Sequence, residues 1–201
     1  LKELIAHQSI DEKIHLVGYS MGGPIIGGFA EKYSDQVKSL SFIAPAGFGK
    51  VQTSFPFFMK IPGVIEWSMH VLADRFYGSA ISSETTHSSD PLSINEEEFQ
   101  QLFSFQMQFK GFRESLASTM RNFNLFDARE MFEKVATKNI PSIAIWGDND
   151  GVVSYRGAET YSEIFHEGKV ITIESGTHDI TYRQPSDVLE AINIFLDSQI
   201  P

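Results

Sequence analysis

The sequence predicts an α/β fold, in which a mostly parallel sheet is flanked by helices and carries a helical insertion. Three observations predict it. An apolar strand runs through a serine turn bounded by glycines directly into a helix, over residues 14–33. Strand-length apolar runs alternate with helical stretches near both ends of the chain. Between them, residues 50–138 interrupt this alternation and have the pattern of helices.

The serine turn is the most informative stretch. Residues 18–23 read Gly-Tyr-Ser-Met-Gly-Gly, and they join an apolar strand over 14–19 to a helix over about 22–33. Strand, Gly-x-Ser-x-Gly and helix in this order are typical of a nucleophile elbow, which exposes a serine hydroxyl above a sheet. We expect the glycines two positions before and after Ser20 to let strand and helix pass closely. The Met21 backbone N–H, at the start of the helix, is expected to bind a developing oxyanion.

The other elements of the α/β part follow in chain order. The strand over 14–19 is apolar without clean alternation, as in parallel strands covered on both faces. A single helix joins it to the next strand, which makes a parallel crossover. Further strands are predicted over 37–44, 143–146 and 170–173, and further helices over about 1–8 and 156–166 and from Pro185 onward.

Residues 50–138 are predicted to be a helical insertion that includes one crossover helix, with 1–49 and 139–201 as the core domain. Ser93 stands three residues before Glu96, which is the spacing of a capping box. Apolar stripes at helical spacing lie near 64–76, 99–109, 112–123 and 131–135, with a loop over 78–92. The insertion holds 12 of the 17 Phe and five of the six Met. Many of these must pack in a core, but we expect some to line the roof of an apolar pocket.

Composition excludes several classes of function. The net charge of −10 and the sequence pI near 5.0 argue against nucleic-acid binding, which needs clustered Lys and Arg. The chain has no cysteine, which excludes disulfides and thiolate metal sites, and its histidines lack ligand spacing. No stretch approaches the roughly 20 apolar residues of a membrane span. We therefore expect no cofactor, no metal and no membrane span, while the compartment and the oligomeric state stay open.

Three polar residues follow predicted strand ends in the order Ser20, Asp150, His178. A serine hydroxyl needs a base within hydrogen-bonding reach, and a histidine base needs an acid to orient it. Because the carboxyl ends of parallel strands meet at one edge of a sheet, these residues are candidates for a catalytic triad. Asp148 is an alternative acid in the same loop. His15 lies inside a strand, and the remaining histidines lie away from predicted strand ends, so they are weaker candidates.

With these motifs the chain resembles the α/β-hydrolase family, in its cap-bearing branch of esterases, lipases and C–C bond hydrolases. Residues 18–23 resemble the family's elbow, and residues 146–153 resemble its W-G-x-x-D-x-x-V acid loop. Residues 176–178 are similar to its histidine loop. Ser154 stands where many members have proline. The resemblance covers nearly the whole chain, and it identifies the insertion with the family's cap.

The resemblance implies a serine hydrolase whose triad is Ser20, His178 and Asp150. In the family the acid lies three residues after the glycine of its loop, which selects Asp150 over Asp148. The Met21 N–H would then supply half of the oxyanion hole. The expected substrate is a small ester with an apolar acyl or aromatic group, cleaved through an acyl-enzyme.

Two alternatives stay open. A C–C bond hydrolase of ring-cleavage dienoates uses the same triad and would need a cation for the substrate carboxylate, for which Arg113 and Arg121 are candidates. A non-catalytic binding protein on the same fold is the other alternative. Epoxide hydrolases and dehalogenases of this fold have aspartate at the elbow, so Ser20 argues against both.

A last expectation concerns the start of the sequence. The family's first strands, and the loop that completes its oxyanion hole, precede the elbow strand, and no such stretch lies upstream of Ser20. We therefore expect this sequence to be the C-terminal part of a longer protein. Residues 14–18 should then form a strand with one side unpaired.

Overall fold

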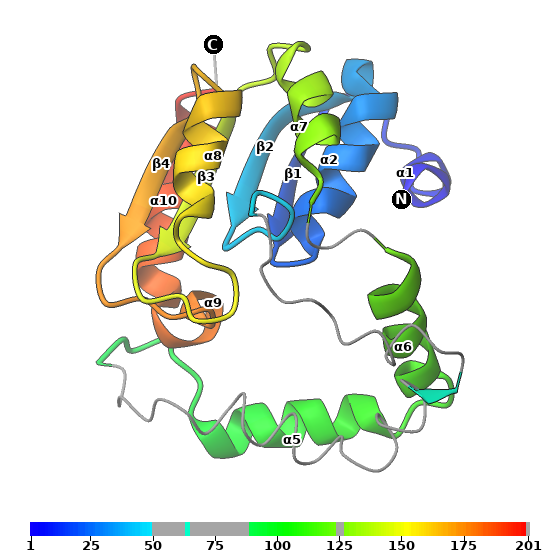
Figure 1. Ribbon diagram of the computed structural model, residues 1–201, viewed down its shortest axis with the longest axis vertical. Helices are drawn as coiled ribbons and strands as arrows, with labels where there is room; N and C mark the ends of the chain where they lie inside the picture. Colours follow the sequence, from blue (N-terminus) through cyan, green and yellow to red (C-terminus); the bar gives the residue numbers. More distant parts are fainter. Residues whose placement is uncertain (50–62, 65–88, 124–126, 200–201) are drawn as a thin grey trace. The chain divides into compact units, whose positions relative to one another are not determined.

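The computed structural model describes residues 1–49, 63–64, 89–123 and 127–199. The chain divides into two compact units. The first unit consists of Leu1–Lys50 and Leu125–Pro201, and the second of Val51–Asn124. The first unit contains the sheet and most of the described helices (Figure 1).

The first unit is built on a four-stranded parallel sheet in the order β1-β2-β3-β4. Its strands are β1 (Ile14–Tyr19), β2 (Val37–Ile43), β3 (Ser142–Gly147) and β4 (Lys169–Ile173). The register places Gly18 beside Phe42, and Phe42 beside Ala144. Since all strands run the same way, their carboxyl ends meet at one edge, and the predicted mostly parallel sheet is confirmed. Within the described residues β1 pairs with β2 alone, so its other side is unpaired, as expected.

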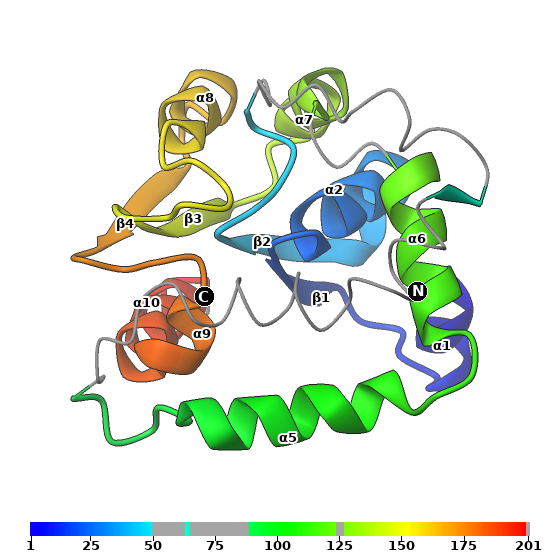
Figure 2. The ribbon, with the colours of Figure 1, turned by 60° about the horizontal axis from the view of Figure 1, so that its bottom comes forward.

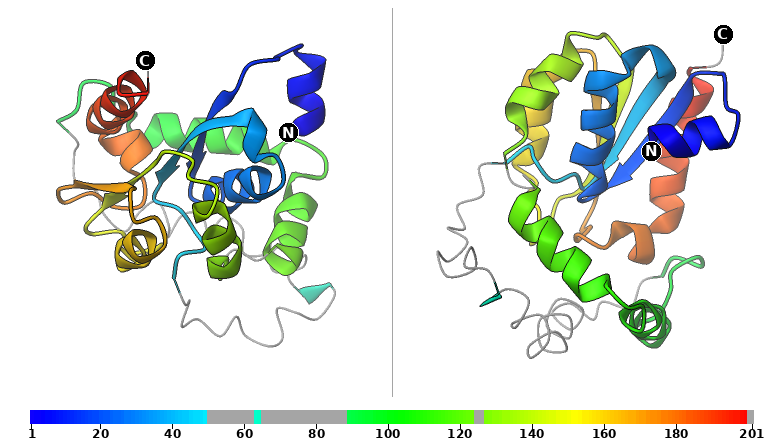
Figure 3. Two further views of the ribbon diagram at one scale, coloured as in Figure 1. Left: turned by 90° about the horizontal axis from the view of Figure 1, so that it is seen from above. Right: turned by 90° about the vertical axis from the view of Figure 1, so that its right-hand side faces the viewer.

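Helices cover both faces of this sheet. Helices α2, α7 and α8 lie on one face, and α9 and α10 on the other (Figures 2 and 3). Among the described helices between β2 and β3 in the chain, α7 is the one in the first unit, where it packs against α2, and it is therefore the crossover helix. The bounds are α1 (Lys2–His7), α2 (Gly22–Lys32), the short 3₁₀ helix η1 (Ser34–Gln36), α7 (Arg129–Ala136), α8 (Gly157–Ile164), α9 (Ile180–Arg183) and α10 (Pro185–Asp197).

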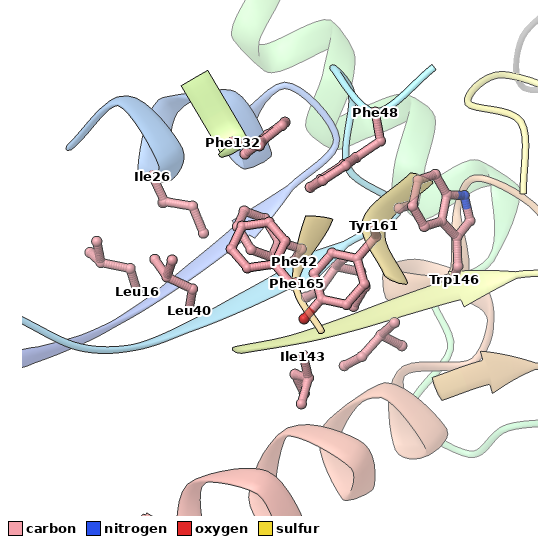
Figure 4. Close-up of a cluster of buried hydrophobic side chains, with 14 of the residues drawn as sticks. Leu16, Ile26, Leu40, Phe42, Phe48, Phe132, Ile143, Trp146, Tyr161 and Phe165 are labelled. Atoms are coloured by element: carbon pink, nitrogen blue, oxygen red, sulfur yellow. The ribbon is translucent and has the colours of Figure 1, made fainter. Parts of the chain in front are cut away.

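An aromatic cluster fills the space between the sheet and helices α7 and α8 (Figure 4). Phe48 and Phe132 stack with their ring centroids 3.9 Å apart, and Phe42 meets both rings edge to face. Phe132 is fully buried, and its neighbour Met131 also packs against this core. Both residues were counted in the Phe- and Met-rich insertion. They stabilise the core of the first unit and therefore do not roof a pocket.

The second unit is described mainly by two helices, α5 (Glu96–Met107) and α6 (Phe112–Asn122). Helix α5 does begin with a capping box, but Asn95 and Glu98 form it, so the predicted pairing of Ser93 with Glu96 is wrong. The Glu98 N–H donates to Asn95 Oδ1 at 2.9 Å, and the Asn95 N–H donates to Glu98 Oε2 at 3.0 Å. Asparagine caps a helix as well as serine does, and both pairs have the same spacing.

Some expectations about the insertion fall outside the described residues. The apolar stripe predicted near 64–76 lies outside the described residues after residue 64. The loop predicted over 78–92 lies outside them up to residue 88. The role of the second unit as a cap stays a prediction. Of the helices that the structure describes, none has the length and the apolar composition needed to cross a bilayer.

Candidate active site

Ser20 lies in the tight turn between β1 and α2. Its φ of 50° falls in the left-handed region, which residues other than glycine rarely adopt. Three backbone hydrogen bonds hold the turn. The Ser20 N–H donates to the Ile43 carbonyl at 2.9 Å, and the N–H groups of Gly23 and Ala46 donate to the Ser20 carbonyl, each at 3.0 Å. The end of β2 and the loop after it therefore keep the serine in the backbone conformation of a nucleophile elbow.

Two glycines make room for this turn, but they are not the pair predicted. A Cβ on Gly18 would lie 2.5 Å from the Gly22 carbonyl oxygen, as expected where the strand passes the helix start. A Cβ on Gly22 would meet nothing within 4 Å, so the expectation of a steric need for glycine there is wrong. Gly23 is the second tight position, because a Cβ there would lie 2.6 Å from the Pro45 Cβ. The strand approaches only the main chain of Gly22, so a residue with a side chain could also occupy that position.

This difference predicts opposite results for two glycine substitutions. Gly18→Ala is expected to lower the free energy of unfolding by about 1–3 kcal/mol, because the new methyl group must displace backbone. Gly22→Ala is expected to leave stability unchanged or raise it by up to about 1 kcal/mol, since alanine favours a helix. Urea unfolding of the two variants measures both effects. Equal destabilisation by the two substitutions would contradict this description of the elbow.

Asp150 lies in the loop after β3, and its carboxyl side chain is fully buried. Its Oδ1 accepts hydrogen bonds from the N–H groups of Val152 at 2.9 Å and Val153 at 2.7 Å. Its Oδ2 lies 2.8 Å from His178 Nδ1. These three bonds fix the carboxylate so that one oxygen faces the histidine. Asp148, the alternative acid, is exposed, so the geometry favours Asp150.

His178 lies in the loop after β4 and connects the other two candidates. Its Nε2 lies 2.9 Å from Ser20 Oγ, while its Nδ1 faces Asp150. With the proton on Nδ1, the ring donates to the carboxylate and leaves Nε2 free to accept the serine proton. The structure therefore brings together the three residues that the sequence singled out, in the geometry that activates a serine.

Met21 directly precedes α2 as its N-cap residue. Within the described residues its N–H donates to no backbone carbonyl. The N-terminus of a helix carries a partial positive charge, which favours an anionic oxygen at this place. The role predicted for Met21 in an oxyanion hole stays a proposal.

Sequence analysis missed Tyr19, which precedes the serine. Its hydroxyl donates to the backbone carbonyl of His178 at 2.9 Å, and the two rings lie with their centroids 5.3 Å apart. Burial, more than the neighbouring Tyr182, raises the pKa of the Tyr19 phenol far above its usual range, so it stays a donor. The only signal in the sequence was its position inside the motif, where the pattern accepts any residue.

Among the residues that the structure describes, the other polar groups form no second catalytic constellation. His15 Nδ1 lies 2.6 Å from Ser39 Oγ within the sheet, and burial, together with the charge of Lys38, lowers the pKa of His15. In the described part of the chain, no group of three or more His, Asp or Glu side chains could hold a metal ion.

A groove of about 790 Å³ lies at the amino ends of β3 and β4, beside Ser142 and Lys169. It is at the opposite end of these strands from Asp150 and His178 and includes neither.

Comparison with known proteins gives a family match and curated relatives. A family model described as the alpha/beta hydrolase fold matches residues 5–183. Lipase 3 of Moraxella sp. (strain TA144) is 26% identical over 195 residues, which cover 89% of this chain and 54% of that protein. Monoacylglycerol lipase ABHD6 of Mus musculus is 27% identical over 199 residues, covering 92% and 55%. The chain thus spans about half the length of the curated relatives it matches.

Solved structures agree in fold. A bromoperoxidase from Bacillus anthracis superposes with a TM-score of 0.75 at 19% identity, over 98% of this chain and 71% of that one. A thermophilic esterase from Thermogutta terrifontis gives a TM-score of 0.69 at 19% identity, over 98% and 70%. A meta-cleavage product hydrolase, CumD, gives 0.66 at 18% identity, over 97% and 68%. At such identities these structures support the fold and do not distinguish one reaction from another.

Proposed function

Because the chain belongs to the α/β-hydrolase family, we propose that it carries the catalytic residues of a serine hydrolase that cleaves carboxylic esters. The main support for this proposal is the continuous hydrogen-bonded path from Asp150 through His178 to Ser20. Asp150 Oδ2 lies 2.8 Å from His178 Nδ1, and His178 Nε2 lies 2.9 Å from Ser20 Oγ. The lipases among its relatives support an ester as the substrate. In this proposal Ser20 is the nucleophile, His178 the base and Asp150 the acid that orients it.

In the first half of the proposed reaction, Ser20 Oγ bonds to the acyl carbon while its proton passes to His178 Nε2. The Met21 N–H donates to the carbonyl oxygen as that oxygen becomes negative. When the intermediate collapses, the bond from the acyl carbon to the alcohol oxygen breaks. His178 Nε2 gives its proton to that oxygen, and the alcohol leaves. Asp150 stays ionised and stabilises the imidazolium that forms between these steps.

In the second half, water removes the acyl group. The water oxygen bonds to the acyl carbon while His178 Nε2 takes one of its protons. The bond between the acyl carbon and Ser20 Oγ then breaks, and the proton returns to Oγ. A carboxylic acid leaves and the starting state is restored, so this reaction consumes only ester and water.

We also propose that the preferred acyl group is apolar. The Phe and Met content of the insertion supports this, and so do exposed side chains of the second unit. Leu102, Phe105 and Phe109 are 58%, 54% and 55% exposed, at helical spacing in and just after α5. The rings of Phe105 and Phe109 meet edge to face at 5.3 Å. Exposed apolar groups that gather on one face suit contact with an apolar ligand.

This proposal predicts a dependence on acyl length. With p-nitrophenyl esters, kcat/KM is expected to rise from acetate through butyrate to hexanoate. Each buried CH₂ contributes about 0.8 kcal/mol, which is up to about fourfold per methylene. The assay uses the natural full-length protein, with Ser20→Ala as the blank. A maximum at acetate, or a preference for charged acyl groups, would contradict an apolar acyl site.

The same assay separates the alternatives. A ring-cleavage dienoate, which carries a carboxylate, is expected to react more slowly than the butyrate ester. Faster cleavage of the dienoate would favour the C–C hydrolase and direct attention to Arg113 in α6. No turnover of either class would favour a non-catalytic binding protein.

A further inference from the structure

Tyr19 contacts His178 in two independent ways, although the residues are 159 positions apart in the chain. Its hydroxyl donates to the His178 backbone carbonyl at 2.9 Å. Its ring also lies beside the imidazole, with centroids 5.3 Å apart and planes inclined by 30°. One side chain of β1 therefore constrains both the main chain and the ring of the histidine.

The histidine ring needs such a constraint. Its bond to Asp150 fixes Nδ1, but rotation about the line from Nδ1 to Oδ2 would still swing Nε2 away from Ser20 Oγ. The Tyr19 ring occupies one side of the imidazole and opposes that rotation. The hydrogen bond to the carbonyl sets the position of the main chain from which the ring projects. An error of about 1 Å in the position of a catalytic group can reduce the rate by about 10²-fold.

Tyr19 is itself well held. Its ring meets the Tyr182 ring of α9 edge on, with centroids 6.2 Å apart and an angle of 84° between the planes. Because its neighbour in the chain is Ser20, the turn that positions the serine hydroxyl also positions the tyrosine. The elbow and the histidine loop are thereby connected through one residue.

We propose that Tyr19 is a positioning residue, which holds the His178 imidazole in line between Asp150 and Ser20. The proposal rests on the proposed function, in which His178 is the base. Tyr19 touches no reacting atom in that mechanism and acts only through His178. Its loss should therefore lower kcat and leave KM nearly unchanged.

Three variants of the natural full-length protein test the proposal. Tyr19→Phe removes the hydrogen bond and keeps the ring, whereas Tyr19→Leu removes both. Tyr161→Phe is the control for loss of a tyrosine hydroxyl, because Tyr161 is buried and its hydroxyl lies 2.8 Å from Ser142 Oγ, at the amino end of β3. Ester hydrolysis gives kcat and KM, and kcat is divided by the fraction of Ser20 that a fluorophosphonate has labelled at completion. This correction removes any contribution from unfolded protein.

We expect kcat per reactive serine to fall roughly tenfold in Tyr19→Phe and roughly 10²-fold in Tyr19→Leu, with KM within about twofold. Tyr161→Phe should lower stability and leave kcat within about twofold. Unchanged kcat per reactive serine in Tyr19→Leu would overturn the proposal.

A spectroscopic readout separates this proposal from the proposed function. The proton NMR resonance of His178 Nδ1–H, which reports its bond to Asp150, is expected to shift or broaden in both Tyr19 variants and to stay in place in Tyr161→Phe. If the natural protein cleaves no ester, the proposed function fails. The Nδ1–H resonance then still shows whether Tyr19 holds the His178 ring in position. A resonance that is unchanged in Tyr19→Leu overturns the role of Tyr19, whatever the activity.

Discussion

Ser20→Ala is expected to lower kcat for ester hydrolysis by roughly 10⁵–10⁶-fold, because in the proposed reaction Ser20 Oγ is the group that forms the acyl-enzyme. Substrate binding would persist, so KM should change far less. The measurement is the turnover of p-nitrophenyl butyrate by the natural full-length protein and by the variant. Ser198→Ala is a matched control, since this serine at the end of α10 is exposed and its hydroxyl donates to the Phe195 carbonyl and accepts from Gln199 Nε2. A Ser20→Ala variant that keeps more than about 1% of kcat would exclude Ser20 as the nucleophile.

Asp150→Asn is expected to lower kcat by roughly 10⁴-fold. The asparagine carbonyl can replace Oδ1 and accept from Val152 and Val153, which directs the amide NH₂ toward His178 Nδ1. A donor at that place favours the tautomer with its proton on Nε2, which cannot take the proton of Ser20.

Asp148→Asn is the matched control for this substitution, because Asp148 lies in the same loop and is exposed. We expect it to change kcat by no more than a few-fold, since most surface substitutions have small effects. Both variants are assayed with the same ester. A larger loss in Asp148→Asn than in Asp150→Asn would reverse the assignment of the acid.

The strands and long helices of the first unit could be predicted because their sequence signals are local. β1 spans Ile14–Tyr19, as its apolar run between polar turns predicted. Helix α10 begins at Pro185, where proline fits the first turn of a helix. That Ser20, Asp150 and His178 lie together could be predicted for a related reason. Parallel topology places the ends of β1, β3 and β4 at one edge, and Ser20, Asp150 and His178 follow those ends.

Other features depend on contacts that the sequence does not display. Gly18, Gly22 and Gly23 look alike in the motif, and only the position of Pro45 shows which of the last two needs to lack a side chain. Helix α9 has four residues, too few for a periodic pattern, so it was not predicted. Tyr19 and His178 come into contact only when folding brings the ends of β1 and β4 to the same edge of the sheet.

Composition was a poorer guide than pattern. The count of Phe and Met in residues 50–138 included Met131 and Phe132, although helix α7 packs both against the core of the first unit. The crossover helix and the rest of the insertion follow each other without a break in the sequence. Because the apolar stripes of both have helical spacing, the sequence alone could not assign these side chains to a core or to a pocket.

Covalent labelling measures whether His178 and Asp150 activate Ser20 as a nucleophile. The natural full-length protein is treated with a fluorophosphonate, and the modified residue is located by mass spectrometry of its peptides. We expect a single phosphonyl adduct on Ser20 that is absent from Ser20→Ala and forms far more slowly in Asp150→Asn. An adduct on another serine, or ester hydrolysis by a protein in which Ser20 is never labelled, would contradict it.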